Sequence, residues 1–220
     1  MLHKREYYEK YKHIIPLIGY GIIYLTWFRL LELRKVHYQV IEMDIDRKIP
    51  FVEIFIIPYL LWFLYMAVVI GYLFLKDRND YYRCCLFLFT GMTIFLVIST
   101  LSPNGHHLRP LVMPRDNVFT SMISALYRTD TSTNLWPSIH VYNSIGSHLA
   151  IAKCRHLKGN KLVQLSSLLL CILIVLSTML IKQHSVFDVI TALILSVIMY
   201  IIVYQWDVLY ATKKAPRTTV

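Results

Sequence analysis

The chain is 220 residues long; 56% of its residues are hydrophobic and only 16% are charged. Seven glycines and eight prolines exclude a fibrous or low-complexity chain. The net charge of +10 does not indicate nucleic-acid binding, because the basic residues form short clusters between hydrophobic runs. This arrangement is typical of a membrane protein whose basic loops meet anionic lipid.

The hydrophobic residues form runs long enough to cross a bilayer. About 20 apolar residues in a helix cover the roughly 30 Å hydrocarbon core, and a segment in lipid must be helical to satisfy its own backbone groups. We therefore predict an all-α polytopic membrane protein, one domain over residues 1–220 with a six-helix transmembrane bundle. The predicted spans are at about 14–33, 52–75, 85–101, 137–152, 162–181 and 186–206.

Two of these runs need comment. The first follows a charged, tyrosine-rich segment without a small-residue cleavage site and is as long as a full span, so we interpret it as a retained helix and not as a signal peptide. The fourth is short for a span, so we expect it to begin inside the protein and not at the lipid surface.

A long polar stretch separates the third and fourth predicted spans. Within it, residues 117–127 carry apolar side chains at one-face helical spacing, and Asp116 or Asn117 could cap the start of a helix. We predict a short amphipathic helix at the membrane interface, which either covers a substrate or packs on the bundle.

The distribution of Lys and Arg predicts the orientation. Most of the 23 basic residues fall on one side if the N-terminus is cytoplasmic, and the positive-inside rule then favours both termini in the cytoplasm. Residues 102–136 and the connection around His184 would face outward. We expect an integral protein of a bacterial plasma membrane with an extracytoplasmic active site.

The four cysteines, Cys84, Cys85, Cys154 and Cys171, show no metal-ligand spacing. Free cysteine behaves as a small apolar side chain, and this is our interpretation of all four.

The first candidate for chemistry is the segment 137–140, Pro-Ser-Ile-His, at the start of the fourth predicted span. Free N–H groups and the positive dipole end of a helix favour an anion there, and Ser138 adds a hydroxyl. His140 can carry a proton near neutral pH and pass it to a leaving group.

The second candidate is the segment 183–188, which leads into the sixth predicted span. His184 and Asp188 are four residues apart, so on a helix they lie within hydrogen-bond reach. A carboxylate on one imidazole nitrogen leaves the other free to attack phosphorus. Asp188 would then orient His184 and not carry the proton.

The third candidate is Arg109-Pro110 in the outer stretch, with Arg115 and Arg128 nearby. The planar guanidinium suits phosphate oxygens. Each candidate alone also has a structural interpretation, such as a helix-end histidine or an arginine on lipid headgroups. All three fall on the same predicted side of the membrane, and ionisable groups inside a membrane protein are functional by default.

These residues resemble the motifs of the type 2 phosphatidic acid phosphatase (PAP2) superfamily of membrane lipid phosphatases and phosphotransferases. Arg109-Pro110 is similar to the end of its first motif, the segment 137–140 to its second, and Ser177, His184 and Asp188 to its third. The resemblance implies a six-helix core and a phosphohistidine reaction without metal or cofactor. It also implies His184 as nucleophile, Asp188 as its partner and His140 as acid and base.

The same resemblance implies Arg109, Ser138 and Ile139 around the substrate phosphate. The sequence departs from the family pattern at Ser102 and Thr178, where the motifs have lysine and arginine, and Ile139 replaces a glycine. Lys182, Arg115 or Arg128 could supply the missing charge. A third motif without arginine is similar to inositol phosphorylceramide and sphingomyelin synthases, which transfer the headgroup to an alcohol.

Three functions follow as hypotheses. The first is hydrolysis of a phosphorylated membrane lipid, such as phosphatidic acid or a polyprenyl (pyro)phosphate. The second is transfer of a phospholipid headgroup to an alcohol. The third is a non-catalytic lipid-binding or transport protein, against which the complete His–His–Asp set argues. The expected partners are the lipid substrate and the bilayer, and not nucleic acid.

Overall fold

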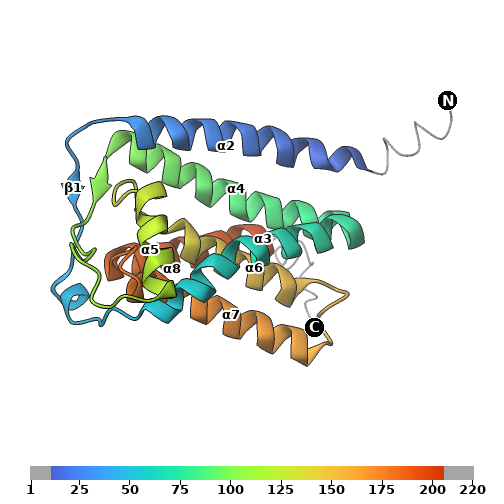
Figure 1. Cartoon of the computed structure of the whole chain (residues 1–220). Helices are drawn as coiled ribbons and strands as arrows, with labels where there is room; N and C mark the ends of the chain where they lie inside the picture. Colours follow the sequence, from blue (N-terminus) through green and yellow to red (C-terminus); the bar gives the residue numbers. More distant parts are fainter. Residues whose placement is uncertain (1–10, 206–220) are drawn as a thin grey trace, which may run out of the picture.

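The structure is a computed structural model and describes residues 11–205. Its seven α-helices are α2 (Ile15–Leu33), α3 (Ile56–Lys76), α4 (Arg78–Leu101), α5 (Val118–Thr129), α6 (Ile139–Lys153), α7 (Lys161–Leu180) and α8 (Val186–Tyr200) (Figure 1). Shorter turns are η1 (Lys12–Ile14), η2 (Asp44–Arg47), η3 (Glu53–Phe55) and the π-helical η4 (Ile201–Gln205). The strands β1 (Gln39–Val40) and β2 (Asn104–Gly105) pair in parallel.

The all-α polytopic membrane fold is confirmed. Within the described residues, five helical segments are long and apolar enough to cross a membrane: Lys12–Leu33, Glu53–Lys76, Arg78–Leu101, Lys161–Leu180 and Val186–Gln205. Residue 206, the predicted end of the sixth span, lies outside the described residues, as do most of residues 1–13 and all of the C-terminal basic cluster.

The fourth predicted span, 137–152, corresponds to α6 and is shorter than the other five. Its 15 residues rise only about 22 Å at 1.5 Å per residue. The helix packs against α3, α4, α7 and α8, and most of its side chains are buried. It therefore forms the centre of the bundle and begins inside the protein.

Helix α4 contains the third predicted span and extends beyond it toward the N-terminus. Helix α4 starts at Arg78 and not near residue 85, because Asp77 caps it by accepting hydrogen bonds from the backbone N–H groups of Asn79 and Asp80. Charged residues in the first turns of α4 lower its hydrophobicity without ending the helix, because they lie at the end of the bundle.

Close approach of α4 and α6 depends on two glycines. A Cβ atom on Gly91 would lie 2.0 Å from the Tyr142 ring, and one on Gly146 would lie 2.5 Å from the Phe87 ring. The Tyr142 hydroxyl donates to the Phe87 carbonyl at 2.7 Å across the same contact. These contacts hold α6 against the bundle and thereby set the depth at which its N-terminus lies.

All the long connections gather at one end of the bundle. The loops on either side of β1 and β2 cover this end, and α5 lies across it (Figure 1). The predicted amphipathic helix is thus α5, with Asn117 as its N-cap. Its Ile123 is fully buried against Ile56, Tyr59 and Ile181, so α5 packs on the bundle end.

Candidate active site

His140, His184 and Asp188 come together at the loop-covered end of the bundle. His140 is the second residue of α6, His184 lies in the turn between α7 and α8, and Asp188 lies in the first turn of α8. The centroids of the two imidazole rings are 5.7 Å apart. All three side chains are buried, at 8%, 5% and 0% exposure.

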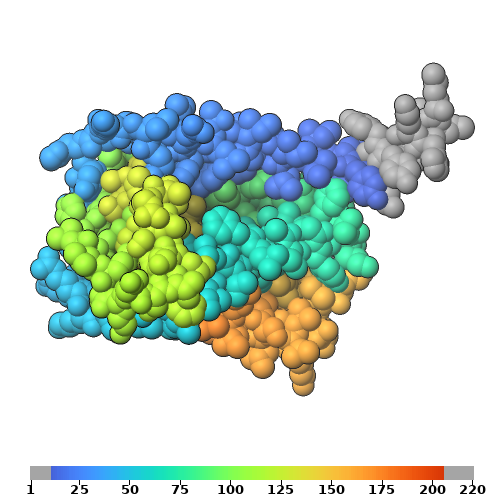
Figure 2. Space-filling view, viewed as in Figure 1, coloured from blue at the N-terminus to red at the C-terminus, as the bar shows by residue number. Residues whose placement is uncertain are grey.

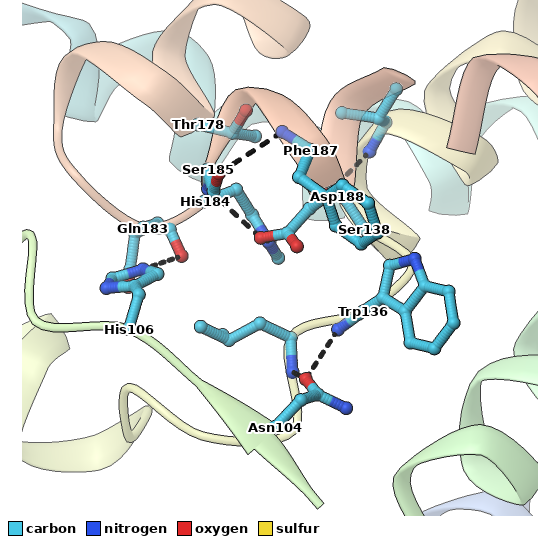
Figure 3. A network of polar contacts seen from close by, with 12 residues as sticks. Asn104, His106, Trp136, Ser138, Thr178, Gln183, His184, Ser185, Phe187 and Asp188 are labelled. Carbon is cyan, nitrogen blue, oxygen red and sulfur yellow. Dashed lines mark hydrogen bonds and ion pairs between the residues drawn. The ribbon is translucent and has the colours of Figure 1, made fainter. Parts of the chain in front are cut away.

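The carboxylate of Asp188 holds the imidazole of His184. His184 Nδ1 lies 3.2 Å from Asp188 Oδ2, and the Ser185 N–H donates to the same oxygen at 3.0 Å (Figure 3). With the proton on Nδ1, His184 Nε2 keeps its lone pair. Burial, and secondly the positive charge of Arg109, lower the pKa of His184 to about 3, so the ring is neutral at pH 7.

The turn between α7 and α8 explains how His184 reaches this place. Lys182 adopts a left-handed conformation with φ of 53°, as is common just after a helix C-terminus. The chain reversal lets the N–H groups of Gln183 and His184 both donate to the Thr178 carbonyl, at 2.9 and 3.0 Å. The Thr178 hydroxyl, at the position of the family arginine, donates back to the Val175 carbonyl of its own helix.

Asp46, from the loop before α3, fixes the start of α8. Its carboxylate accepts hydrogen bonds from the Ser185 hydroxyl at 2.6 Å and from the Val186 N–H at 2.8 Å. The Lys182 ammonium donates to the carbonyls of Asp46 and Ile49, at 2.7 and 2.6 Å. Lys182 therefore holds this loop against the turn, and its ammonium is not directed at the two histidines.

His140 is held by aromatic rings. Its imidazole stacks on Tyr59 with centroids 4.6 Å apart and lies 4.4 Å from the Trp62 ring. Its Nδ1 is buried and has no hydrogen-bond partner among the described residues. The ring is thus positioned by packing, while its nitrogens stay available to a ligand.

Ser138 is the N-cap of α6. Its hydroxyl accepts from the Val141 N–H at 3.4 Å, and its own N–H lies 3.4 Å from the Asp188 carbonyl, so it joins α6 to α8 beside the histidines. Ile139 follows it and lines a neighbouring apolar groove.

Arg109 lies beside the site with its terminal nitrogens occupied. They donate to the carbonyls of Tyr127, Asp130 and Thr131 and to Gln183 Oε1, and the guanidinium lies 4.4 Å from the Tyr127 ring centroid. Its Nε is buried without a partner among the described residues. Arg109 thus ties the α5–α6 loop to the residue before His184, and Nε is its one unoccupied donor group.

His106 is a site residue that the sequence patterns did not single out. The Leu108 N–H donates to its Nδ1 at 3.2 Å, so the ring proton is on Nε2, which donates to the Gln183 carbonyl at 2.9 Å (Figure 3). This histidine supports the His184 turn from the β2 side. Its position four residues into a long polar loop carried no periodic signal.

Asn104 was missed in the same way. Its side-chain oxygen accepts from the N–H groups of Leu135 and Trp136, at 2.8 and 3.0 Å (Figure 3). It thereby aligns the segment that enters α6. An asparagine in a loop can have many structural roles, and its contact with a segment about 30 residues away is visible only in the folded chain.

Two predicted phosphate ligands are not brought to the histidines. Arg115 pairs with Glu53 of η3, with Nε 2.7 Å from Oε1. Arg128 is exposed on α5. Neither makes a described contact with His140, His184 or Asp188.

An apolar groove adjoins the site. It has a volume of about 590 Å³ and is lined by residues of α2, α3, α4, α5 and α6, among them His140. Figure 2 shows the side of the molecule on which α2 (blue) and α3 (cyan) border it.

One comparison with known proteins gives a match. Residues 113–210 match the family model of the PAP2 superfamily, a stretch that includes His140, His184 and Asp188. No curated protein and no solved structure gives a significant match to the chain. This part of the chain, from just before α5 through α8, is therefore similar to the PAP2 superfamily.

Proposed function

We propose that this protein is a membrane lipid phosphatase that hydrolyses a lipid phosphomonoester or pyrophosphate through a phosphohistidine at His184. The observation that carries the proposal is the 3.2 Å contact between His184 Nδ1 and Asp188, with the His140 ring 5.7 Å away. This arrangement provides an oriented neutral nucleophile and a second proton carrier within the reach of one phosphoryl group.

In the first step, His184 Nε2 attacks phosphorus, and the bond from phosphorus to the lipid oxygen breaks. His140 donates a proton to that leaving oxygen, and the Asp188 carboxylate stabilises the positive charge that develops on His184. From a phosphomonoester the products are a lipid alcohol and a phosphoryl group on His184 Nε2. From a pyrophosphate, attack on the terminal phosphorus breaks the bridging P–O bond, and the lipid monophosphate leaves instead of the alcohol.

In the second step, His140 takes a proton from water, and the water oxygen attacks phosphorus. The P–N bond breaks and inorganic phosphate leaves, which restores neutral His184. Of the predicted phosphate donors, Arg109 Nε has no partner among the described residues and the Ser138 hydroxyl caps the helix that carries His140; both would stabilise charge on the equatorial oxygens. The metal-independent mechanism requires no further group.

Headgroup transfer to an alcohol is the second candidate. It uses the same histidine on a phosphodiester: diacylglycerol leaves, His184 Nε2 holds the phosphate with its headgroup still attached, and an alcohol in place of water then attacks phosphorus and breaks the P–N bond. Thr178 and Ile139 favour it, since both depart from the phosphatase pattern and a third motif without arginine is similar to that of the lipid phosphotransferases.

The test uses the full chain purified in detergent with EDTA. Phosphatidic acid and a polyprenyl pyrophosphate are offered, and released phosphate is compared between the wild type and His184→Ala. His148→Ala is the matched control, because His148 is half-buried between helices and, among residues 11–205, its one hydrogen bond is to Ser167 in α7. Release that depends on His184 supports hydrolysis. Release that survives His184→Ala refutes it, and a new headgroup-bearing lipid formed only with an alcohol acceptor establishes transfer.

We also propose that the site faces the extracytoplasmic side of a bacterial plasma membrane with both termini in the cytoplasm. The support is the concentration of basic residues in the segments opposite the site. Labelling of single cysteines introduced at Arg128 and at Lys158 with an impermeant reagent tests it: modification of the first alone in intact cells is expected, and modification of the second alone would reverse the orientation.

A further inference from the structure

The groove beside His140 opens toward lipid. Its walls are aromatic and aliphatic side chains of α2, α3 and α4, and two of them, Leu25 and Phe63, are 66% and 58% exposed on spanning helices. A volume of about 590 Å³ falls in the range of about 300–1,000 Å³ that is usual for ligand pockets. The groove therefore connects the proton carrier to the bilayer.

A polar side chain lies unpaired at the inner end of this apolar groove. Asn143 is 1% exposed and lines the groove, and neither its side-chain nitrogen nor its oxygen has a hydrogen-bond partner among residues 11–205. It lies three residues after His140 on α6, so both side chains are on one face of the helix. The Trp62 Nε1 and Tyr24 hydroxyl groups, also on the groove wall, are unpaired in the same part of the chain.

Such a group is costly unless a ligand satisfies it. A buried amide without hydrogen bonds loses its hydration without compensation, and native proteins rarely leave one in this state. An amide offers both donors and an acceptor, so it suits a hydroxyl, ester or amide group. Because Asn143 lies one turn beyond His140, the ligand group that it binds would lie between the phosphate and the hydrocarbon chain.

We propose that the groove takes the hydrocarbon part of the phosphorylated lipid substrate and that Asn143 hydrogen-bonds a hydroxyl, ester or amide group of its backbone. This inference rests on the proposed function and narrows it. Glycerolipid and sphingolipid phosphates carry such a group a few atoms from phosphorus, and polyprenyl phosphates carry none. The substrate class is therefore a glycerolipid or sphingolipid phosphate.

The experiment measures kcat/KM for dioleoyl phosphatidic acid and for a polyprenyl phosphate in the wild type, Asn143→Leu and Asn143→Ala. Leucine keeps the branching of asparagine, and alanine avoids crowding. Loss of one satisfied hydrogen bond lowers kcat/KM on phosphatidic acid by about tenfold. The value on polyprenyl phosphate stays unchanged, because that lipid has no group for Asn143. Ser196→Ala is the control, since Ser196 is equally buried on α8 and bonds only its own helix.

A binding measurement separates this inference from the proposed reaction. In the His184→Ala background, phosphatidic acid raises the thermal unfolding midpoint more than polyprenyl phosphate does, and Asn143→Leu removes the difference. Equal losses on both lipids, or a wild-type preference for polyprenyl phosphate, overturn the inference while the phosphatase reaction stands. Selective binding without His184-dependent release upholds the inference and refutes hydrolysis.

Discussion

The two histidines of the site are held in different ways. His184 sits in a polar network in which Asp188 binds its ring, and Asp46 and His106 hold its backbone turn. His140 makes no described hydrogen bond through Nδ1 and is held between the rings of Tyr59 and Trp62. A nucleophile needs a fixed tautomer, which only hydrogen bonds provide. A group that gives and takes a proton needs a free nitrogen, which packing leaves available.

We expect the largest effect from disrupting the polar network that holds His184. Asp188→Asn lowers kcat by about 10,000-fold, as expected when a buried carboxylate that orients a catalytic histidine is lost. Phosphate release at pH 7 is the measurement, with Asp80→Asn at the opposite end of the bundle as the control. A loss smaller than tenfold would show that Asp188 does not orient the nucleophile.

Replacement of His140, the histidine held by aromatic rings, tests its role as the acid, because substrates differ in how much their leaving group needs a proton. His140→Asn lowers turnover of a lipid phosphate by about 100- to 10,000-fold, because the alkoxide then leaves without a proton. Turnover of aryl phosphates such as p-nitrophenyl phosphate falls much less in this variant, since their leaving group needs no protonation. The ratio of the two losses is measured, and equal losses would refute the role of His140 as acid.

Weakening the support of His184 has a smaller effect. Asp46→Ala releases Ser185 and Val186, and the resulting displacement of His184 lowers kcat by as much as about 100-fold. Asp46→Asn keeps one acceptor oxygen and restores part of kcat. KM is expected to stay constant, because Asp46 does not line the apolar groove. A change in KM alone would point to substrate binding instead of positioning.

The pH dependence of stability reports on the buried state of His184. Its folded pKa of about 3 lies below the ordinary value of 6.5, so its stabilising contribution is present above pH 6.5 and is lost as pH falls toward 3. The free energy of unfolding falls by at most about 1.4 kcal/mol per pH unit from this residue. Asp130, whose burial raises its pKa to about 6, acts in the opposite direction below pH 6.

Comparison of the wild type with His184→Ala in detergent between pH 6.5 and 4 isolates the contribution of His184. The wild type is expected to lose stability faster with falling pH than the variant. Parallel curves would mean that His184 takes up a proton in the folded protein as readily as in the unfolded chain.

The smallest effect is expected at the far end of the bundle. Asp77→Ala removes the N-cap of α4 and the 2.5 Å contact with the exposed Arg155. The free energy of unfolding falls by about 0.5–2 kcal/mol, the usual cost of losing a cap, while kcat per folded molecule does not change. A thermal unfolding midpoint with a parallel activity assay tests this, and a lowered kcat would show that the two ends are coupled.

Much of this molecule followed from local patterns. Apolar runs located the spanning helices, because a bilayer permits little else than helix over such a length. One-face spacing and Asn117 located α5. The spacing of His184 and Asp188 predicted a contact that depends only on the first turn of one helix.

Three basic residues show where prediction from local sequence patterns fails. Lys182, Arg115 and Arg128 are near the motifs in sequence, but a long flexible side chain can point in any direction that the tertiary structure leaves open. The backbone at Lys182 turns its ammonium toward Asp46 and Ile49, and Arg115 pairs with Glu53 of η3.

By itself the sequence determined the helical membrane class, the positions of most helices and the pair of His184 and Asp188, since each depends on neighbours within a few turns. The tertiary structure alone decided which distant groups meet: Asp46 at the start of α8, His106 beside the His184 turn, and Asn143 in a groove that α2, α3, α4 and α5 also line. These contacts join segments separated by up to 140 residues. Sequence periodicity reports only on neighbours along one helix, so it does not predict contacts that arise when whole helices pack together.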